Sequence, residues 1–201
     1  LNVQSSAERV LHDIAFGLPA GQVLGLLGRT GSGKTTLTRL LFRLYDPTAG
    51  AIRLGGAELR QVALADLRTR VGIVTQDVQL FQATIRDNLT LFDREIADER
   101  VLAALAELGL RPWLDSMPGG LDTELGPSGA GLSAGEAQLL AFARALLQDP
   151  DLVILDEASS RLDPETERRL AGATNALVRG RTAVIIAHRL STLTHVDAVC
   201  V

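Results

Sequence analysis

The 201-residue chain has a single cysteine, Cys200, which excludes an internal disulfide and favours a reducing compartment. Cys200 lies in the apolar run DAVCV, and this predicts a small buried residue in a strand. Long hydrophobic runs are also missing, because the segments LLAFARALL and TAVIIAH fall short of the roughly 18–20 apolar residues of a membrane span. We therefore expect a soluble chain, truncated at both ends, since it lacks an initial Met and stops inside an apolar run.

Clusters of basic residues are scarce as well. The chain has 20 Lys and Arg against 24 Asp and Glu, which gives a formal net charge of -4. Binding to nucleic acid requires a basic surface that neutralises phosphates, so no nucleic-acid partner is expected. The hydrophobic content of 46% suits a globular protein with one core.

Short apolar runs alternate with helical patterns and predict an α/β fold. Four continuous runs have the length and composition of strands buried on both faces: residues 23–27, 71–74, 152–155 and 183–186. An alternating pattern over residues 10–18 predicts a further strand with one wet face, at the N-terminal end of the chain.

Helical patterns dominate the middle of the chain. A stripe of leucines (Leu37, Leu40, Leu41 and Leu44) predicts the first helix, and residues 98–108 form a later one that Gly109 ends. Further helices are expected to begin near Ser133 and at Asp163, where Pro164 takes the first helical position. We predict a core of residues 1–76 and 149–201, interrupted by a helical subdomain of residues 77–148.

Residues 28–35 read GRTGSGKT and match the phosphate-binding pattern G-x-x-x-x-G-K-[ST] in full. A buried strand precedes the motif and an amphipathic helix follows it, so the backbone N–H groups can turn towards a phosphate. The Lys34 charge is expected on the β- and γ-phosphates and the Thr35 hydroxyl on Mg²⁺. The candidate nucleotide-binding residues are Gly28, Arg29, Thr30, Gly31, Ser32, Gly33, Lys34, Thr35 and Thr36. The fold class is thus a P-loop NTPase core with a mostly parallel sheet, an antiparallel β part at the N-terminus and an inserted α-helical subdomain.

Polar residues follow the other core strands where open α/β sheets bind ligands. Asp156 ends the run 152–155 and is expected to hold Mg²⁺, while the adjacent Glu157 polarises an attacking water. Gln76 would bridge the Mg²⁺ shell and that water, and His188 would reach the γ-phosphate. Taken alone, the two acids could be solubilising charges and the histidine structural. Beside a P-loop, they predict phosphoryl transfer to water, catalysed by Lys34, Gln76, Glu157 and His188.

A second glycine-containing helix start, GLSAGEAQ at residues 131–138, narrows the choice among families of P-loop NTPases. Here the chain resembles the nucleotide-binding domain of ABC ATPases, whose signature is usually Leu-Ser-Gly-Gly-Gln. The ordered set of motifs covers nearly the whole chain, including Ser160-Arg161-Leu162-Asp163 in place of the usual D-loop Ser-Ala-Leu-Asp. Residues 79–89 and 187–192 look like those of exporter-type ABC domains.

The resemblance implies a composite site. In the family, two domains pair head to tail around two Mg-ATP, and Ser133 and Gly135 of the signature, with Asp163 of the D-loop, would contact the nucleotide held by the partner's P-loop. Transmembrane domains would dock in the groove of the Q-loop and helical subdomain, near Asp77, Leu80 and Phe81. These expectations place the chain at the cytoplasmic face of a membrane, as the ATPase of an exporter.

The sequence departs from the family pattern at several positions. Ala134 replaces a glycine of the signature, and Glu136 replaces its glutamine, so we expect this carboxylate to face away from the triphosphate. Residues 123–129 lack the Glu-Arg pair of exporters. No aromatic residue lies near Val3, where exporters carry the ring that stacks on adenine.

Two other functions stay open from the sequence. A soluble ABC ATPase of nucleic-acid repair or translation is the first, although no long coiled coil separates Gln76 from Ser133. A slow regulatory domain of an asymmetric pair is the second, although Glu157 and His188 are both present. Among neighbouring residues, Trp113 is interpreted as packing and Arg144 as solvated or ion-paired, while Phe81 fits core and partner contact equally well.

Overall fold

The computed structural model describes residues 10–29, 31–75, 77–156, 163–187 and 196–201. Its centre is a parallel five-stranded sheet with the order β4-β5-β6-β1-β7. The strands are β1 (Val23–Leu26), β4 (Val71–Val74), β5 (Leu152–Asp156), β6 (Thr182–Ile186) and β7 (Ala198–Cys200). A short antiparallel hairpin, β2 (Arg53–Leu54) and β3 (Ala57–Glu58), completes the β structure among the described residues. The predicted mixed α/β class, with a mostly parallel sheet and a small antiparallel part, is confirmed.

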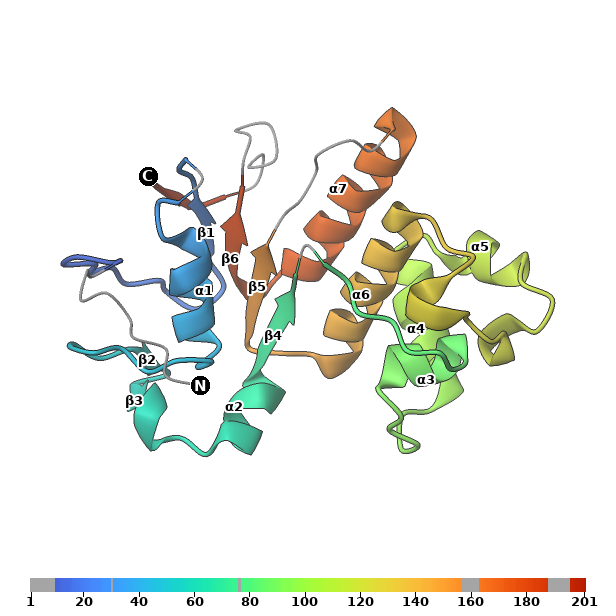
Figure 1. Cartoon of the computed structure of the whole chain (residues 1–201), viewed down its shortest axis with the longest axis horizontal. Helices are drawn as coiled ribbons and strands as arrows, with labels where there is room; N and C mark the ends of the chain where they lie inside the picture. The colour runs from blue at the N-terminus through green and yellow to red at the C-terminus, as the bar shows by residue number, and fades with distance from the viewer. Residues whose placement is uncertain (1–9, 30, 76, 157–162, 188–195) are drawn as a thin grey trace.

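Helices cover both faces of the sheet (Figure 1). One face packs against α1 (Lys34–Leu41) and α2 (Leu64–Arg70), and the other against α6 (Ala134–Gln148) and α7 (Pro164–Val178). Beyond α6 lie α3 (Ile85–Thr90), α4 (Asp98–Glu107) and α5 (Arg111–Asp115). The remaining short helices are η1 (Leu59–Gln61), η2 (Gly120–Asp122) and η3 (Pro127–Gly129). None of the helices in the described part of the chain is long and apolar enough to cross a membrane.

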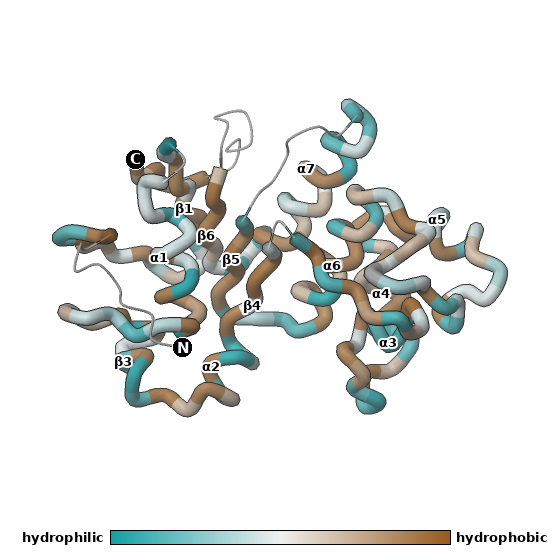
Figure 2. Tube along the Cα trace, in the orientation of Figure 1, coloured by the Kyte–Doolittle hydropathy of each residue, from teal (hydrophilic) through white to brown (hydrophobic). Residues whose placement is uncertain are grey.

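Alternation along the central strands divides the core into two clusters. In β5, Val153 and Leu155 join the cluster under α6 and α7, whereas Leu152 and Ile154 join the cluster under α1 and α2. The same alternation runs along β6, and Figure 2 shows the strands as the hydrophobic centre of the molecule. Successive side chains of a strand point to opposite faces, so an apolar run without polar interruptions fits a sheet covered on both sides.

The first of these clusters also contains most of the buried residues of α3, α4, α5 and α6. The sheet face and the helical region therefore share one continuous core, and the division at residues 77 and 148 stays a prediction. Trp113 is 7% exposed within this cluster, which confirms that it is a packing residue.

Local capping explains where the long helices begin. The Ser133 hydroxyl accepts a hydrogen bond from the Glu136 N–H at the start of α6, and the Asp163 carboxylate accepts from two N–H groups at the start of α7. The predicted starts of both helices are confirmed. In α1 the predicted stripe is too long, because the helix ends at Leu41 and Leu44 is half exposed.

Two predictions at the ends of the chain are wrong. Residues 10–18 form no strand, and Ile14 and Phe16 are 52% and 44% exposed. An alternating pattern makes a strand only where a neighbouring strand supplies hydrogen-bond partners. Cys200 lies in a strand as predicted, yet it is exposed, because β7 is the edge strand and pairs only with β1 among the described residues.

The packing of α6 on α7 requires a glycine at residue 135. A Cβ at Gly135 would overlap the methyl group of Thr166, whose hydroxyl donates to Asp163 Oδ2 at 2.6 Å. Thr166 is β-branched and held by this bond, so it has little freedom to move aside.

We therefore expect Gly135→Ala to destabilise the fold by about 1–3 kcal/mol through overpacking. Gly172→Ala is the matched control, because Gly172 also lies in a helix and a Cβ there meets nothing within 4 Å. That substitution should stabilise the protein by about 0.5–1 kcal/mol, as the flexibility of glycine is lost. Urea denaturation of both variants measures the change in their free energy of unfolding. A change in the same direction for both would contradict the packing argument.

Candidate functional site

The loop after β1 is shaped by glycines that no other residue can replace. Gly33 is the N-cap of α1 and has a φ of 92°, a left-handed conformation that favours glycine. A Cβ at Gly33 would lie 2.6 Å from Leu11 Cδ2, and a Cβ at Gly28 would lie 2.7 Å from Ser32 Oγ. Both glycines therefore leave room for neighbouring side chains, so that the backbone can curl tightly as in a phosphate-binding loop.

Lys34 lies at the start of α1 and folds back over this loop. Its ammonium donates to the Gly28 carbonyl at 2.6 Å and to the Arg29 carbonyl at 2.9 Å, with Ser32 Oγ at 3.4 Å. The charge is thus held at the predicted phosphate cradle. Gly31, Thr35 and Thr36 belong to the same turn and first helical turn, whereas Thr30 lies outside the described residues.

The carboxyl ends of the parallel strands meet at one edge of the sheet. Register pairs Leu26 of β1 with Ile186 of β6, and Ile186 with Asp156 of β5. Asp156 therefore lies across one strand from the end of β1, from which the P-loop begins. Asp156 is partly buried and engaged in an interaction of its own.

The other predicted catalytic residues follow the same edge in sequence. Gln76 comes after β4, Glu157 directly after β5, and His188 two residues after β6. All three lie outside the described residues, so their roles stay predictions. The strands that precede them are described, and their parallel order matches the expected convergence.

The oxygen ligands at this edge suit a magnesium ion that takes its remaining ligands from a bound nucleotide and from water. Within the residues that the structure describes, no group of three or more His, Cys, Asp or Glu could hold a metal ion. The hydroxyl of Thr35 and the carboxylate of Asp156 are hard oxygen ligands, and Mg²⁺ commonly takes one or two such ligands and completes its shell with phosphates and water. The residues present therefore fit a Mg-nucleotide rather than a protein-only metal cage.

The second candidate site is the start of α6, a helix of 15 residues. Glu136 Oε2 accepts from the Ser133 N–H at 2.7 Å and from the Ser133 hydroxyl at 2.8 Å, while Ser133 Oγ accepts from the Glu136 N–H at 3.2 Å. This is a capping box, and its sequence signal is the pattern S-x-x-E at residues 133–136. The Glu136 carboxylate thus turns back onto Ser133 at the very start of the helix, and it does not face away from the predicted phosphate contact as expected.

Asp163 of the predicted D-loop caps α7. Its carboxylate accepts from the Glu165 and Thr166 N–H groups, both at 3.0 Å, and from the Thr166 hydroxyl. Hydrogen bonds from the Thr166 side chain and backbone lower the pKa of the Asp163 carboxyl. Through Thr166, this cap also touches Gly135 of the predicted signature. A nucleotide contact by Asp163 stays a prediction.

Sequence reasoning missed a polar cluster behind the signature helix. Arg144, interpreted as solvated or ion-paired, is partly buried and donates to backbone carbonyls of Gln79 and Asn88. Asn88 is a fully buried polar residue that no sequence pattern singles out. Phe81 is not core: it is 47% exposed and meets Phe92 edge-on, with 5.5 Å between ring centroids.

Comparisons with known proteins agree with this geometry. The ATP-binding protein YknV of Bacillus subtilis, an ABC transporter, is 43% identical over 193 residues, covering 96% of this chain and 32% of its own length. The human mitochondrial iron-sulfur clusters transporter ABCB7 is 44% identical over 194 residues, covering 96% of this chain and 26% of its own. The ATP-dependent lipid A-core flippase of Burkholderia pseudomallei is 43% identical over 193 residues, covering 96% and 32% respectively.

A solved structure of a bacterial Atm1-family ABC exporter with ATP bound superposes with a TM-score of 0.87 and 37% identity. It covers 96% of this chain and 34% of its own, so the chain spans about a third or less of the proteins that it matches. A sequence model of the family described as ABC transporter matches residues 11–160. The chain therefore belongs to the ABC transporter family, as an ATP-binding domain of the exporter type.

Proposed function

We propose that the chain hydrolyses ATP as the motor domain of an exporter-type ABC transporter, at the cytoplasmic face of a membrane. The observation that carries this proposal is the presence of two separate helix starts in one chain, the glycine cradle before α1 and the capped Ser133 before α6. Each would form half of a phosphate site, completed by a second copy or a related domain. Residues 77–148 would act as the helical subdomain that carries the second half.

At the first half-site, the loop N–H groups and Lys34 would bind the phosphates of ATP. Thr35 and Asp156 would hold the magnesium ion, which neutralises charge on the phosphates when bound. Gln76, Glu157 and His188 would orient the attacking water and contact the γ-phosphate. The protein's contribution is positioning and charge neutralisation rather than covalent chemistry.

At the second half-site, Ser133 and Gly135 would bind the γ-phosphate held by the partner domain. Because each ATP would be bound by both domains, ATP would favour the paired state over the separate domains. Hydrolysis would remove this preference, and the two domains would separate. The membrane domains that carry substrate would contact the exposed aromatic pair of Phe81 and Phe92. The alternatives, an ATPase of nucleic-acid repair or translation and a slow regulatory domain, are not favoured by the exporter-type relatives.

The first test is the solution mass of Glu157→Gln with Mg-ATP and with Mg-ADP. Loss of the carboxylate should stall hydrolysis, so we expect a dimer with Mg-ATP and a monomer with Mg-ADP. Adding Ser133→Arg, which places a bulky side chain at the second half-site, should abolish the dimer while ATP binding to the monomer persists. A monomer that binds ATP but never pairs would rule out pairing of this chain with itself.

The charge on Glu136 generates a second prediction. Glu136→Gln keeps the capping box, since glutamine also accepts the Ser133 N–H bond, but removes a negative charge beside the predicted γ-phosphate contact. One unit charge is worth about 1 kcal/mol at close range in water, so the ATP concentration for half-maximal dimerisation should fall about fivefold in the Glu157→Gln background.

Glu99→Gln is the matched control, because Glu99 is an exposed acid in the first turn of another helix, α4. It should leave the half-maximal ATP concentration unchanged. An equal or weaker dimerisation of Glu136→Gln would show that this carboxylate does not oppose the triphosphate.

A further inference from the structure

Arg144 is a partly buried arginine on α6, the helix that begins after Ser133. It lies on α6 about three turns beyond Ser133. Its Nε donates to the Asn88 carbonyl at 2.5 Å, and its two terminal nitrogens donate to Asn88 Oδ1 at 2.9 Å and the Gln79 carbonyl at 2.6 Å. None of the ion pairs found in the described residues includes Arg144, and burial lowers the pKa of its guanidinium. Within the described part of the chain, the acceptors bound by this desolvated cation are neutral, and they fix the geometry between α6, α3 and segment 79–84.

Asn88 extends this contact into the segment of residues 79–84. The fully buried Asn88 amide donates to the Phe81 carbonyl at 2.9 Å and the Thr84 carbonyl at 3.0 Å, and its Oδ1 accepts from the Phe81 N–H at 2.8 Å. Segment 79–84 is therefore tied to α3 at several points, and Arg144 binds both the segment and α3. We call the bonds among Gln79, Asn88 and Arg144 the Arg144 link.

A second contact connects segment 79–84 to the loop just before Ser133. Leu80 packs on Gly129, where a Cβ would lie 2.5 Å from Leu80 Cδ1. The Gly129 carbonyl in turn accepts from the Leu132 N–H at 3.0 Å. Segment 79–84 thus holds α6 at two places, just before its start through Leu80 and Gly129, and about three turns further along through the Arg144 link.

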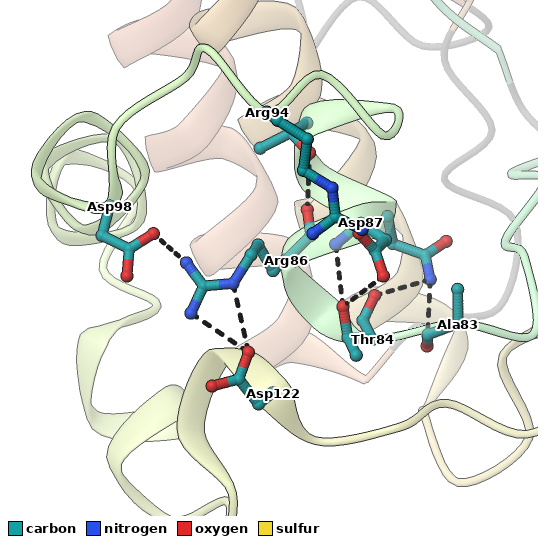
Figure 3. A network of polar contacts seen from close by, with 9 residues as sticks. Ala83, Thr84, Arg86, Asp87, Arg94, Asp98 and Asp122 are labelled. Carbon is teal, nitrogen blue, oxygen red and sulfur yellow. Dashed lines mark hydrogen bonds and ion pairs between the residues drawn. The ribbon is translucent and has the colours of Figure 1, made fainter.

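The helix that carries Asn88 is itself anchored (Figure 3). Arg86 of α3 forms ion pairs with Asp98 at the start of α4 and with Asp122 of η2. Thr84 caps α3 by accepting from the Asp87 N–H at 3.0 Å. These bonds leave α3 little freedom to absorb a displacement of its neighbours, so a force on segment 79–84 reaches α6.

We propose that Arg144 is a positioning residue that makes segment 79–84 and the start of α6 move as one body. Contact at the exposed Phe81 would then set the placement of Ser133 against the partner's ATP. This inference rests on the proposed function only for its final step, the action of Ser133 at a composite site. The rigid connection itself concerns this chain alone.

Hydrogen exchange of the monomer tests the connection. Arg144→Lys keeps the charge but loses the fork of three bonds. We expect exchange to speed up about tenfold in two separate stretches, residues 79–90 and 129–136, with β5 and β6 unchanged. Arg100→Lys is the matched control, because Arg100 binds α6 within one turn of Arg144 but from α4 rather than from segment 79–84: its guanidinium donates to the Leu147 carbonyl at 3.1 Å. It should change neither stretch. A change in Arg144→Lys confined to residues 79–90, or a uniform increase across the chain, would overturn the proposal.

Mixed pairs of chains test whether the connection serves ATP hydrolysis. In one pairing, Arg144→Lys is mixed with an excess of Glu157→Gln, so the altered α6 faces a P-loop that cannot hydrolyse. In the other, wild type is mixed with an excess of the double variant Glu157→Gln/Arg144→Lys, so the altered α6 faces the hydrolysing P-loop. Both dimers contain the same substitutions, and a loss of folding affects them equally.

We expect turnover of Mg-ATP per hydrolysing chain to be about a hundredfold lower in the second pairing, as for an oriented donor group that is displaced by about 1 Å. Ser133→Ala in place of Arg144→Lys calibrates the assay. If Ser133→Ala gives the asymmetry and Arg144→Lys does not, Arg144 has no positioning role. If Ser133→Ala gives no asymmetry, the proposed composite site fails, and the exchange experiment alone decides the connection.

Discussion

The parallel pairing of β1, β4, β5 and β6 is the constraint on which the first half-site depends. Parallel strands end at the same edge of a sheet, so loops that are far apart in the sequence leave from neighbouring points. The register Leu26–Ile186–Asp156 aligns the start of the P-loop with the predicted magnesium ligand. A slip by one residue would exchange the two apolar faces of a strand, which the two separate core clusters oppose.

The start of α6 has no such support, because it does not lie at the end of a strand. Side-chain contacts hold α6 instead: Gly135 against Thr166 of α7 and Gly129 against Leu80 near its start, and the Arg144 link to α3 about three turns further along. Two of these three contacts need a glycine, since the neighbouring side chain occupies the space of a Cβ. The second half-site is therefore a tertiary feature, whereas the first is largely a property of local sequence and strand order.

That difference explains what the sequence predicts well. Strands buried on both faces can be predicted because nearly every residue in them is apolar. The P-loop can be predicted because its glycines and lysine have fixed spacing. The prediction of a strand over residues 10–18 is wrong, because an alternating apolar pattern does not indicate whether a partner strand is present. Arg144 and Asn88 are missed for a related reason. The bonds between them join residues 56 positions apart in the sequence, and no local pattern predicts such a bond.

The capping box at Ser133 is a different kind of miss. Its signal, Ser followed three residues later by Glu, is present in the sequence, but the resemblance to a family motif makes Glu136 stand out only as a departure from a glutamine. In the structure the same residue stabilises the start of α6 and occupies both donors of Ser133. A residue can thus support the helix start and compete with an anion that the helix start would bind.

The two kinds of contact on α6 also differ in how they resist movement. In the core cluster, α6 contributes apolar side chains such as Leu140 and Ala143, and apolar contacts have no preferred direction. Towards segment 79–84 it presents the Arg144 link, whose hydrogen bonds weaken steeply once their angles change. A rotation of α6 across the sheet therefore costs less than a shift of α6 against segment 79–84. Any displacement of the signature helix is expected to carry that segment, and the exposed Phe81 on it, along with Ser133.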